Sequence, residues 1–164
     1  MPLPRKWVSQ SLVLLFFLGA FLILLTGVGR HPYSSLFLNI YLDETHNETL
    51  LHAQKVEIDQ IIILAYTHSS DGTPVQQIFR VSNSKTLDLL EERYRWYGAG
   101  LEFGSGYDIS YKDGWVFVTG YDRSFNPLPV RIASTVSQVL IINSVEIHLS
   151  DLAPAGSRLL IKLE

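Results

Sequence analysis

The feature that most constrains this chain is an uncharged run of 23 residues near its N-terminus, residues 7–29. Its centre, residues 12–25, contains only leucine, isoleucine, valine, phenylalanine, glycine and alanine. A helix of about 20 apolar residues crosses the hydrocarbon core of a bilayer, so the run is long enough to span one. Arg5 and Lys6 precede it and only Arg30 follows closely. The positive-inside rule then places the N-terminus in the cytoplasm and the rest of the chain outside.

A cleaved signal peptide is the alternative interpretation, because a basic start and an apolar run occur in signal peptides as well as in anchors. Residues 26–29 are small enough to hold a cleavage site, but they contain no Ala-x-Ala pattern. A buried core helix is a third interpretation, although a helix that is apolar on every face suits lipid better. We therefore predict a membrane anchor or signal segment over residues 1–29, which crosses the membrane through residues 7–29. Residues 30–164 are expected to form one periplasmic or extracellular domain.

Charge and cysteine content limit what this domain can bind. Of the 13 basic and 16 acidic side chains, three basic ones and no acidic one lie within residues 1–30. The remainder therefore carries a net charge of −6, which disfavours nucleic acid, because phosphates are bound through Lys and Arg. The lack of cysteine rules out disulfides, iron–sulfur clusters and thiolate zinc sites.

Short apolar runs separated by turn residues dominate the rest of the sequence. Strand-like runs lie at 36–42, 61–66, 75–81, 107–111, 115–118, 139–142, 145–149 and 157–163. Residues 43–55 are polar and are expected to form a loop or a weak strand, whereas residues 86–97 fit a helix face as well as a strand. The Asp113-Gly114 pair suits a type I′ hairpin turn, and Gly72 is expected to take a positive φ. The pattern predicts an all-β fold, an antiparallel β-sandwich or a barrel-like domain.

The sequence contains no complete catalytic, cofactor or metal motif. His68, Ser69 and Asp71 have the residue types of a triad, but residues this close together cannot readily adopt its geometry. They are better suited to hydrogen-bonding the following turn, or to contacting a ligand or partner. The glycines of residues 98–106 match neither a dinucleotide fingerprint nor a P-loop. The five histidines are scattered, with no pair at helical ligand spacing. We therefore predict that the protein is not an enzyme and holds no cofactor or metal.

Aromatic residues are concentrated in residues 94–125, which contain ten of them. Most are expected to lie in the core or to form cross-strand pairs. Tyr and Trp also carry a polar tip that suits contact surfaces. A partner-binding face in this part of the chain is therefore plausible from the sequence, and Tyr94 is a candidate contact residue.

Two blocks of sequence stand out together. Residues 66–75, followed by Phe79, contain His-Ser-Ser-Asp-Gly-Thr-Pro-Val, and residues 92–101 run from aromatic residues into Gly-Ala-Gly-Leu. The features that follow them in order are the 113–115 turn, Arg131 and the closing run 152–163. Over roughly residues 36–164 the chain thereby resembles the bacterial family called domain of unknown function eighteen-fifty. It departs from the family pattern at positions 70–72, where Ser, Asp and Gly stand in place of an apolar, an acidic and a basic residue.

This resemblance implies a role beside a transporter. Such proteins typically have an N-terminal membrane segment, and their genes tend to lie beside those of TAXI-type TRAP transporters, which pair a solute receptor with a permease. An accessory protein that contacts the TRAP permease or the TAXI solute receptor is the implied function. The candidate contact residues are His68, Ser69, Thr73, Pro74, Tyr94, Gly98, Ala99, Gly100 and Arg131. The alternative is a module that binds a small organic anion between these loops, with Arg131 or Arg123 as the countercharge.

Overall fold

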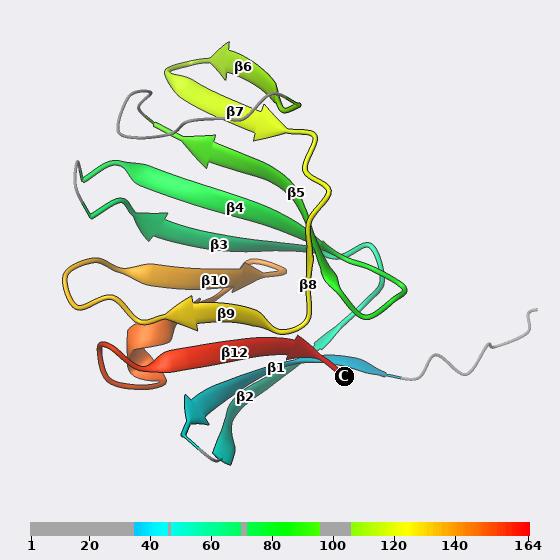
Figure 1. The fold of residues 1–164 in the computed structure, drawn as a ribbon, viewed down its shortest axis with the longest axis vertical. Coiled ribbons are helices and arrows are strands. Elements are labelled where there is room, and N and C mark those ends of the chain that lie inside the picture. Colours follow the sequence, from blue (N-terminus) through cyan, green and yellow to red (C-terminus); the bar gives the residue numbers. More distant parts are fainter. Residues whose placement is uncertain (1–34, 46, 70–71, 96–105) are drawn as a thin grey trace, which may run out of the picture. The chain divides into compact units, whose positions relative to one another are not determined.

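The computed structural model describes residues 35–164 apart from residue 46, residues 70–71 and residues 96–105 (Figure 1). The chain divides into two compact units, Met1–Ser34 and Ser35–Glu164, and the described residues all belong to the second. The predicted membrane segment, residues 7–29, lies outside them and stays a prediction. Within the described ranges, no helix has both the length and the apolar character that a membrane span requires.

The described residues form an all-β unit, with antiparallel pairing throughout. This confirms the predicted fold class. The strands are β1 (Leu36–Glu44), β2 (Asn47–Val56), β3 (Ile61–Thr67), β4 (Pro74–Val81), β5 (Leu87–Tyr94), β6 (Asp108–Lys112), β7 (Trp115–Thr119), β8 (Ser124–Phe125), β9 (Leu128–Arg131), β10 (Gln138–Ile142), β11 (Val145–His148) and β12 (Arg158–Leu163). A short 3-10 helix, η1 (Leu149–Asp151), follows β11.

The strands belong to two sheets. The four-stranded sheet has the order β2-β1-β12-β9, and the eight-stranded sheet has the order β11-β10-β3-β4-β5-β7-β6, with β8 paired to β5. Alternate residues of both sheets meet in one shared core, as in a β-sandwich. Leu38 and Ile40 of β1 and Ile62 of β3 are fully buried there.

The larger sheet extends beyond this shared core. A second, smaller cluster of buried residues consists of Val75, Tyr94, Val116 and Val118, on β4, β5 and β7. Tyr66 and Tyr121 are half-buried and pack against both clusters. The two clusters therefore meet along a line of tyrosines on one face of the eight-stranded sheet.

Strand β2 covers most of residues 43–55, for which the sequence predicts a loop or a weak strand. It lies at the edge of its sheet, and among the described strands it pairs only with β1. Its polar residues remain mostly exposed. Strand β2 is therefore kept in place mainly by its backbone hydrogen bonds to β1, because it has few alternating apolar residues to bury.

Two expected turn conformations are confirmed. Asp113 and Gly114, between β6 and β7, have φ values of 52° and 75°, as a type I′ turn requires. Gly72, between β3 and β4, has a φ of 71°. The Asn143-Ser144 turn between β10 and β11 likewise has two positive φ values.

Candidate functional site

A row of aromatic and β-branched residues crosses the inner face of the eight-stranded sheet, which we define as the face that carries the core residue Ile62. Tyr66 of β3 lies opposite Val75 of β4. Val75 in turn lies opposite Tyr94 of β5, and Tyr94 lies opposite Val116 of β7. Directly opposite residues of antiparallel strands share a face. This row therefore contains three of the four residues of the second cluster and sets Tyr66 and Tyr94 on the same surface.

A β-bulge places a carboxylate beside this row. Strict alternation from the buried Leu89 would turn Glu92 to the outer face. The register of β5 shifts instead, with Leu89 opposite Phe79 but Glu92 opposite Gln77, so that Leu90 is the extra residue. Glu92 thereby joins Leu89 and Gln77 on the inner face.

Glu92 is the centre of a hydrogen-bonded cluster, which we call the Glu92 cluster and define as Gln77, Glu92, Tyr94 and Tyr121. Tyr94 Oη donates to Glu92 Oε2 at 2.5 Å, and Tyr121 Oη donates to the same oxygen at 2.7 Å. Gln77 Nε2 donates to the other oxygen, Oε1, at 2.6 Å. The ring of Tyr107 extends the cluster, with its centroid 4.9 Å from that of Tyr121. Two strands and the β7–β8 connection thus converge on one carboxylate.

The surroundings keep the phenols of this cluster protonated. Burial raises the pKa of Tyr94 and of Tyr121 far above the ordinary value, and hydrogen bonding to the negative Glu92 adds to the rise. The pKa of Tyr66 is also raised, chiefly by burial and secondly by the negative charge of Glu92. A protonated phenol can donate a hydrogen bond but is a poor base or nucleophile. The cluster is therefore suited to recognition.

Among the described residues, neutral groups donate all the hydrogen bonds that Glu92 accepts, and Glu92 forms no ion pair with any of these residues. Its neighbour Arg93 pairs with Glu91 on the outer face, and Arg95 lies over the ring of Trp115 at 5.4 Å. A half-buried carboxylate held only by neutral donors favours the approach of a cationic group.

The turn between β3 and β4 holds four of the residues predicted to form a contact loop. The His68 amide donates to the Thr73 carbonyl at 2.8 Å, and the Gly72 amide donates to the His68 carbonyl at 3.0 Å. Ser69 is exposed, His68 and Thr73 are half-buried, and Pro74 begins β4. The Pro74 carbonyl accepts a hydrogen bond of 3.3 Å from the amide of Arg95, next to Tyr94. The structure therefore sets this turn beside the end of β5.

The glycine segment predicted to form the second loop, Gly98, Ala99 and Gly100, lies outside the described residues. Its proximity to the β3–β4 turn stays a prediction. No three histidine, aspartate or glutamate side chains of the described ranges gather closely enough to hold a metal ion.

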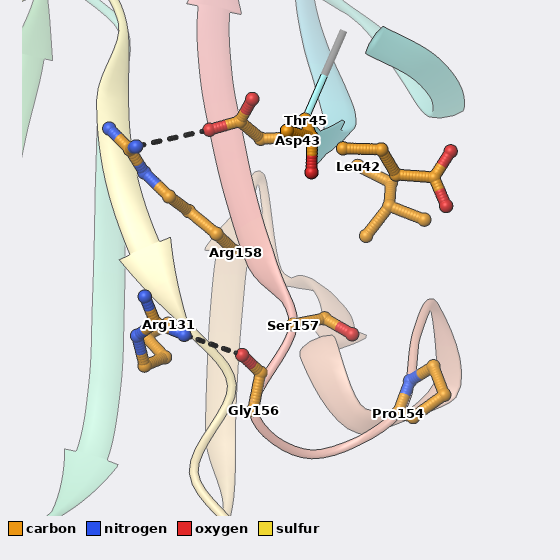
Figure 2. Close-up of a pocket in the computed structure, with 9 residues that line it drawn as sticks. Leu42, Asp43, Thr45, Arg131, Pro154, Gly156, Ser157 and Arg158 are labelled. Carbon is orange, nitrogen blue, oxygen red and sulfur yellow. Dashed lines mark hydrogen bonds and ion pairs between the residues drawn. The ribbon is translucent and has the colours of Figure 1, made fainter. Parts of the chain in front are cut away.

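Arg131 lies on the other sheet. It is the last residue of β9, directly opposite Arg158 of β12, and its Nη1 donates to the Gly156 carbonyl at 2.7 Å. Arg158 Nη1 lies 3.2 Å from a carboxylate oxygen of Asp43. Figure 2 shows these contacts at the side of a hollow of about 660 Å³, which Ser157 also lines.

The structure does not bring Arg131 and His68 into one pocket. Val130 is buried in the shared core, so the side chain of Arg131 points to the outer face of the four-stranded sheet. Arg123 is also apart from this hollow. Its guanidinium lies over the ring of Phe125 at 5.3 Å, in the connection that leads to β8.

Sequence reasoning found Tyr94 but missed Glu92, Gln77 and Tyr121. The bulge at Leu90 hid Glu92, because it breaks the alternation from which inward residues are read. Tyr121 lies 29 positions beyond Glu92 in the sequence, a separation at which spacing gives no signal. The available signal was the excess of tyrosine between residues 94 and 125.

Comparison with known proteins places this chain in a family. The model of the family described as Domain of unknown function (DUF1850) matches residues 62–149, which is more than half of the chain. The chain belongs to the DUF1850 family. No curated protein and no solved structure matches it.

The residues that match the DUF1850 family model include the Glu92 cluster but little of the hollow beside Arg131. The whole Glu92 cluster and the β3–β4 turn lie within the matched residues. The hollow beside Arg131 is lined mainly by residues outside the match, among them Asp43 and Arg158. The Glu92 cluster is therefore the site that belongs to the DUF1850 part of the chain.

Proposed function

We propose that this DUF1850 protein is a membrane-anchored accessory protein of a TAXI-type TRAP solute uptake system and acts by protein–protein contact. The uncharged residues 7–29 would anchor it, with the β domain periplasmic or extracellular. The partner would be the TRAP permease or the TAXI solute receptor. Family membership and the N-terminal run support this role, and the Glu92 cluster supplies a surface for it.

The carrying observation is the carboxylate of Glu92, which three neutral donors hold in place on a tyrosine-lined face. Charged groups that are taken out of water are stabilised when an opposite charge meets them in a fixed geometry. A lysine or arginine of the partner would find this carboxylate already oriented and flanked by aromatic rings that also attract cations. The adjoining β3–β4 turn, with His68, Ser69, Thr73 and Pro74, would form the rim of the contact.

The chemistry of the cluster supports contact over catalysis. Its phenols have raised pKa values, so they remain donors at neutral pH and do not serve as bases. Glu92 is already occupied by three hydrogen bonds. Three hydrogen bonds hold the carboxylate in one orientation and leave acceptor capacity for a further donor, which suits recognition of a fixed partner group.

Co-purification with the permease and the receptor tests this function. In cells that express all three proteins, Glu92→Gln should reduce capture of the partner by about tenfold, a loss of about 1.4 kcal/mol. Glu91→Gln is the matched control, since it removes the same charge from the outer face of the same strand. Equal capture by wild type and Glu92→Gln would exclude the cluster from the contact. Failure of wild type to capture either protein would exclude the transporter role itself.

Binding of a small organic anion is a second candidate, and the hollow in Figure 2 favours it. Two guanidinium groups project from directly opposite positions, Arg131 and Arg158, and each is oriented by a hydrogen bond or ion pair. Guanidinium groups bind carboxylates in a bidentate manner. Calorimetric titration with succinate should show binding that Arg131→Ala abolishes and Arg123→Ala leaves intact. No heat of binding with wild type would remove this candidate.

A further inference from the structure

One end of the β domain contains the start of β1 and the start of β3. The first pair of β1 and β2, Leu36 with Val56, sets the end of β2 beside the start of β1. The short β2–β3 connection, residues 57–60, begins there, and Ile61 opens β3 (Figure 1). We call this end, with the start of β1, residues 57–60 and the start of β3, the entry end.

Four large apolar side chains of the entry end are exposed. Ile58 is 51% exposed and Val145 is 49% exposed, followed by Ile61 at 44% and Phe37 at 39%. Val145 belongs to this end because its partner in β10 lies in turn opposite the second residue of β3. Single exposed apolar side chains are ordinary on a protein surface, whereas a group of them at one end indicates a contact surface.

Ile58 occupies the corner of a tight turn. The Gln60 amide donates to the Glu57 carbonyl at 3.2 Å, and Asp59 has a φ of 65°. The Asp59 amide donates to the Val81 carbonyl at 2.8 Å, which fixes the turn against the end of β4. Turn corners ordinarily carry Gly, Pro, Asn, Asp or Ser. An exposed isoleucine held at such a corner is therefore available to an apolar medium outside the domain.

The exposed side chains lie on different faces of the entry end. Leu38 and Ile62 are buried in the shared core. Side chains alternate along a strand, so the neighbouring Phe37 and Ile61 lie on the outer faces of different sheets. A rigid protein partner would have to enclose the whole end to contact both. Fluid lipid can surround apolar side chains that enter the headgroup boundary from any face, so the arrangement fits a bilayer surface.

The charges beside Ile58 indicate the kind of lipid. Glu57 and Asp59 flank it in the turn, and both are exposed. An anionic membrane surface would repel these carboxylates. Zwitterionic headgroups carry an ammonium group with which a carboxylate can pair. A zwitterionic surface is therefore the better match for this turn.

The predicted membrane segment keeps the entry end near such a surface. Only six residues, 30–35, separate residues 7–29 from β1. Six residues span about 20 Å when fully extended. If residues 7–29 cross the membrane, the start of β1 is therefore held within about this distance of the headgroups.

We infer that the entry end of the β domain docks on a zwitterionic bilayer surface, with its exposed apolar side chains in the headgroup region. The inference rests on the proposed membrane anchor and adds a second attachment, which fixes the orientation of the domain. The β3–β4 turn lies at the other end of its strands. It then faces away from the bilayer.

A spin label in place of Ile58 tests this contact. The chain has no cysteine, so Ile58→Cys gives the full-length protein one site for a nitroxide. In phosphatidylcholine vesicles, power saturation compares access of oxygen, which concentrates in lipid, with access of a nickel chelate, which stays in water. The ratio of oxygen to nickel access should be about fivefold higher than for Ser134→Cys, an exposed serine of the β9–β10 connection at the other end. Equal ratios would overturn the inference.

A label within the predicted anchor separates this inference from the proposed function. Leu18→Cys, in the middle of residues 7–29, should give a high ratio of oxygen to nickel access. A lipid-exposed label at Leu18→Cys with a water-exposed one at Ile58→Cys would keep the anchor and refute the docking. A water-exposed label at Leu18→Cys would refute both. Low access of both reagents at Ile58→Cys would show a contact with protein, such as a second copy, and would also overturn the inference.

Lipid composition tests the choice of headgroup. Phosphatidylglycerol vesicles present an anionic surface, which repels Glu57 and Asp59. The ratio of oxygen to nickel access at Ile58→Cys should therefore be lower in these vesicles than in phosphatidylcholine. A ratio at least as high in phosphatidylglycerol would refute the zwitterionic surface.

Introduced charges test the docking from a second position. A label at Val145→Cys should be lipid-exposed in the otherwise wild-type protein. Ile58→Asp/Ile61→Asp should lower its ratio of oxygen to nickel access to that of Ser134→Cys, because charged groups resist entry into the headgroup boundary. Leu50→Asp is the matched control, since Leu50 is also 51% exposed but lies in β2 toward the β1–β2 turn, and it should leave the ratio unchanged. Equal effects of the two substitutions would refute the docking.

Discussion

Tyr94 and Glu92 lie two positions apart on the inner face of β5, and the phenol donates to the carboxylate at 2.5 Å. The same carboxylate oxygen accepts from Tyr121 at 2.7 Å. Tyr121 belongs to the connection that leaves β7 for β8. Through this one oxygen, hydrogen bonds therefore connect strand β5 of the eight-stranded sheet to the β7–β8 connection.

This shared oxygen predicts energetic coupling between Tyr121 and Glu92. Tyr121→Phe should lower the free energy of unfolding by about 1 kcal/mol, because it removes one hydrogen bond to a charged group. In the presence of Glu92→Gln, Tyr121→Phe should lower the free energy of unfolding by a smaller amount, because the phenol no longer donates to a negative charge. Urea denaturation of wild type, both single variants and the double variant should give a coupling of about 1 kcal/mol. Additive effects would show that the two groups do not interact in solution.

The raised pKa values predict loss of stability at alkaline pH. Tyr94 and Tyr121 have pKa values above the ordinary 10.0 in the folded protein. Unfolded chains therefore release these protons first, and the stabilisation is complete below pH 10 and falls as the pH rises above it. Each tyrosine should contribute a slope of about 1.4 kcal/mol per pH unit. Denaturation curves between pH 8 and 11 should show this decline.

Substitution by phenylalanine provides the control for that slope. The variant Tyr94→Phe/Tyr121→Phe should have lower stability at pH 8 and a flatter decline above pH 10. A slope that is the same in wild type and in this double variant would contradict the assignment to the buried phenols.

The all-β fold and its hairpins could be predicted because their signals are local. The pair Asp113-Gly114 needs only its own backbone preferences to form a type I′ turn. The continuous apolar run from Ile61 likewise marks a strand that is buried among neighbours. Expectations of this kind depend on a few adjacent residues, and the structure confirms them.

The candidate site could not be predicted in the same way, because it depends on a register shift and on contacts distant in sequence. The sequence left residues 86–97 open between a helix and a strand. The alternation of Leu87 and Leu89, when it is read as a strand, assigns Glu92 to the wrong face. Only the pairing of β4 with β5 reveals the bulge at Leu90. Arg131 was expected as the countercharge between the two loops, whereas its position on β9, opposite Arg158, follows from strand pairing alone.

Gly72 permits a test of backbone strain without a steric clash. Its φ is 71°, and a Cβ added there would meet no heavy atom within 4 Å. Gly72→Val should therefore lower the free energy of unfolding by about 1–2 kcal/mol through the left-handed backbone alone. Gly72→Asn is the matched control and should cost less, because asparagine tolerates this conformation. Equal melting midpoints for the valine variant and wild type would mean that the turn has ordinary dihedral angles.

The uncharged N-terminal run predicts the topology of the whole chain. Arg5 and Lys6 stand before residues 7–29, so a C-terminal alkaline phosphatase fusion should be active and a C-terminal fusion to a cytosolic reporter should be dark. The opposite pattern would place the β domain in the cytoplasm and refute the proposed location. Sequencing of the mature N-terminus distinguishes the two forms of export, since a start near residues 28–30 indicates a cleaved signal peptide.

Substitutions of side chains in the β3–β4 turn test whether this turn contributes to partner contact or to folding. Its hydrogen bonds from His68 to Thr73 and from Gly72 to His68 use backbone atoms, so alanine side chains leave them intact. The circular dichroism spectrum and the melting midpoint of the variant His68→Ala/Ser69→Ala then show whether it folds as wild type does. Capture of the TRAP permease or TAXI receptor in detergent extracts should nevertheless fall by about tenfold, because the rim of the contact has lost its polar groups. Undiminished capture by the folded variant would remove this turn from the interface. Hydrolysis of an ester or glycoside by wild type, abolished in His68→Ala, would show instead that the domain is an enzyme.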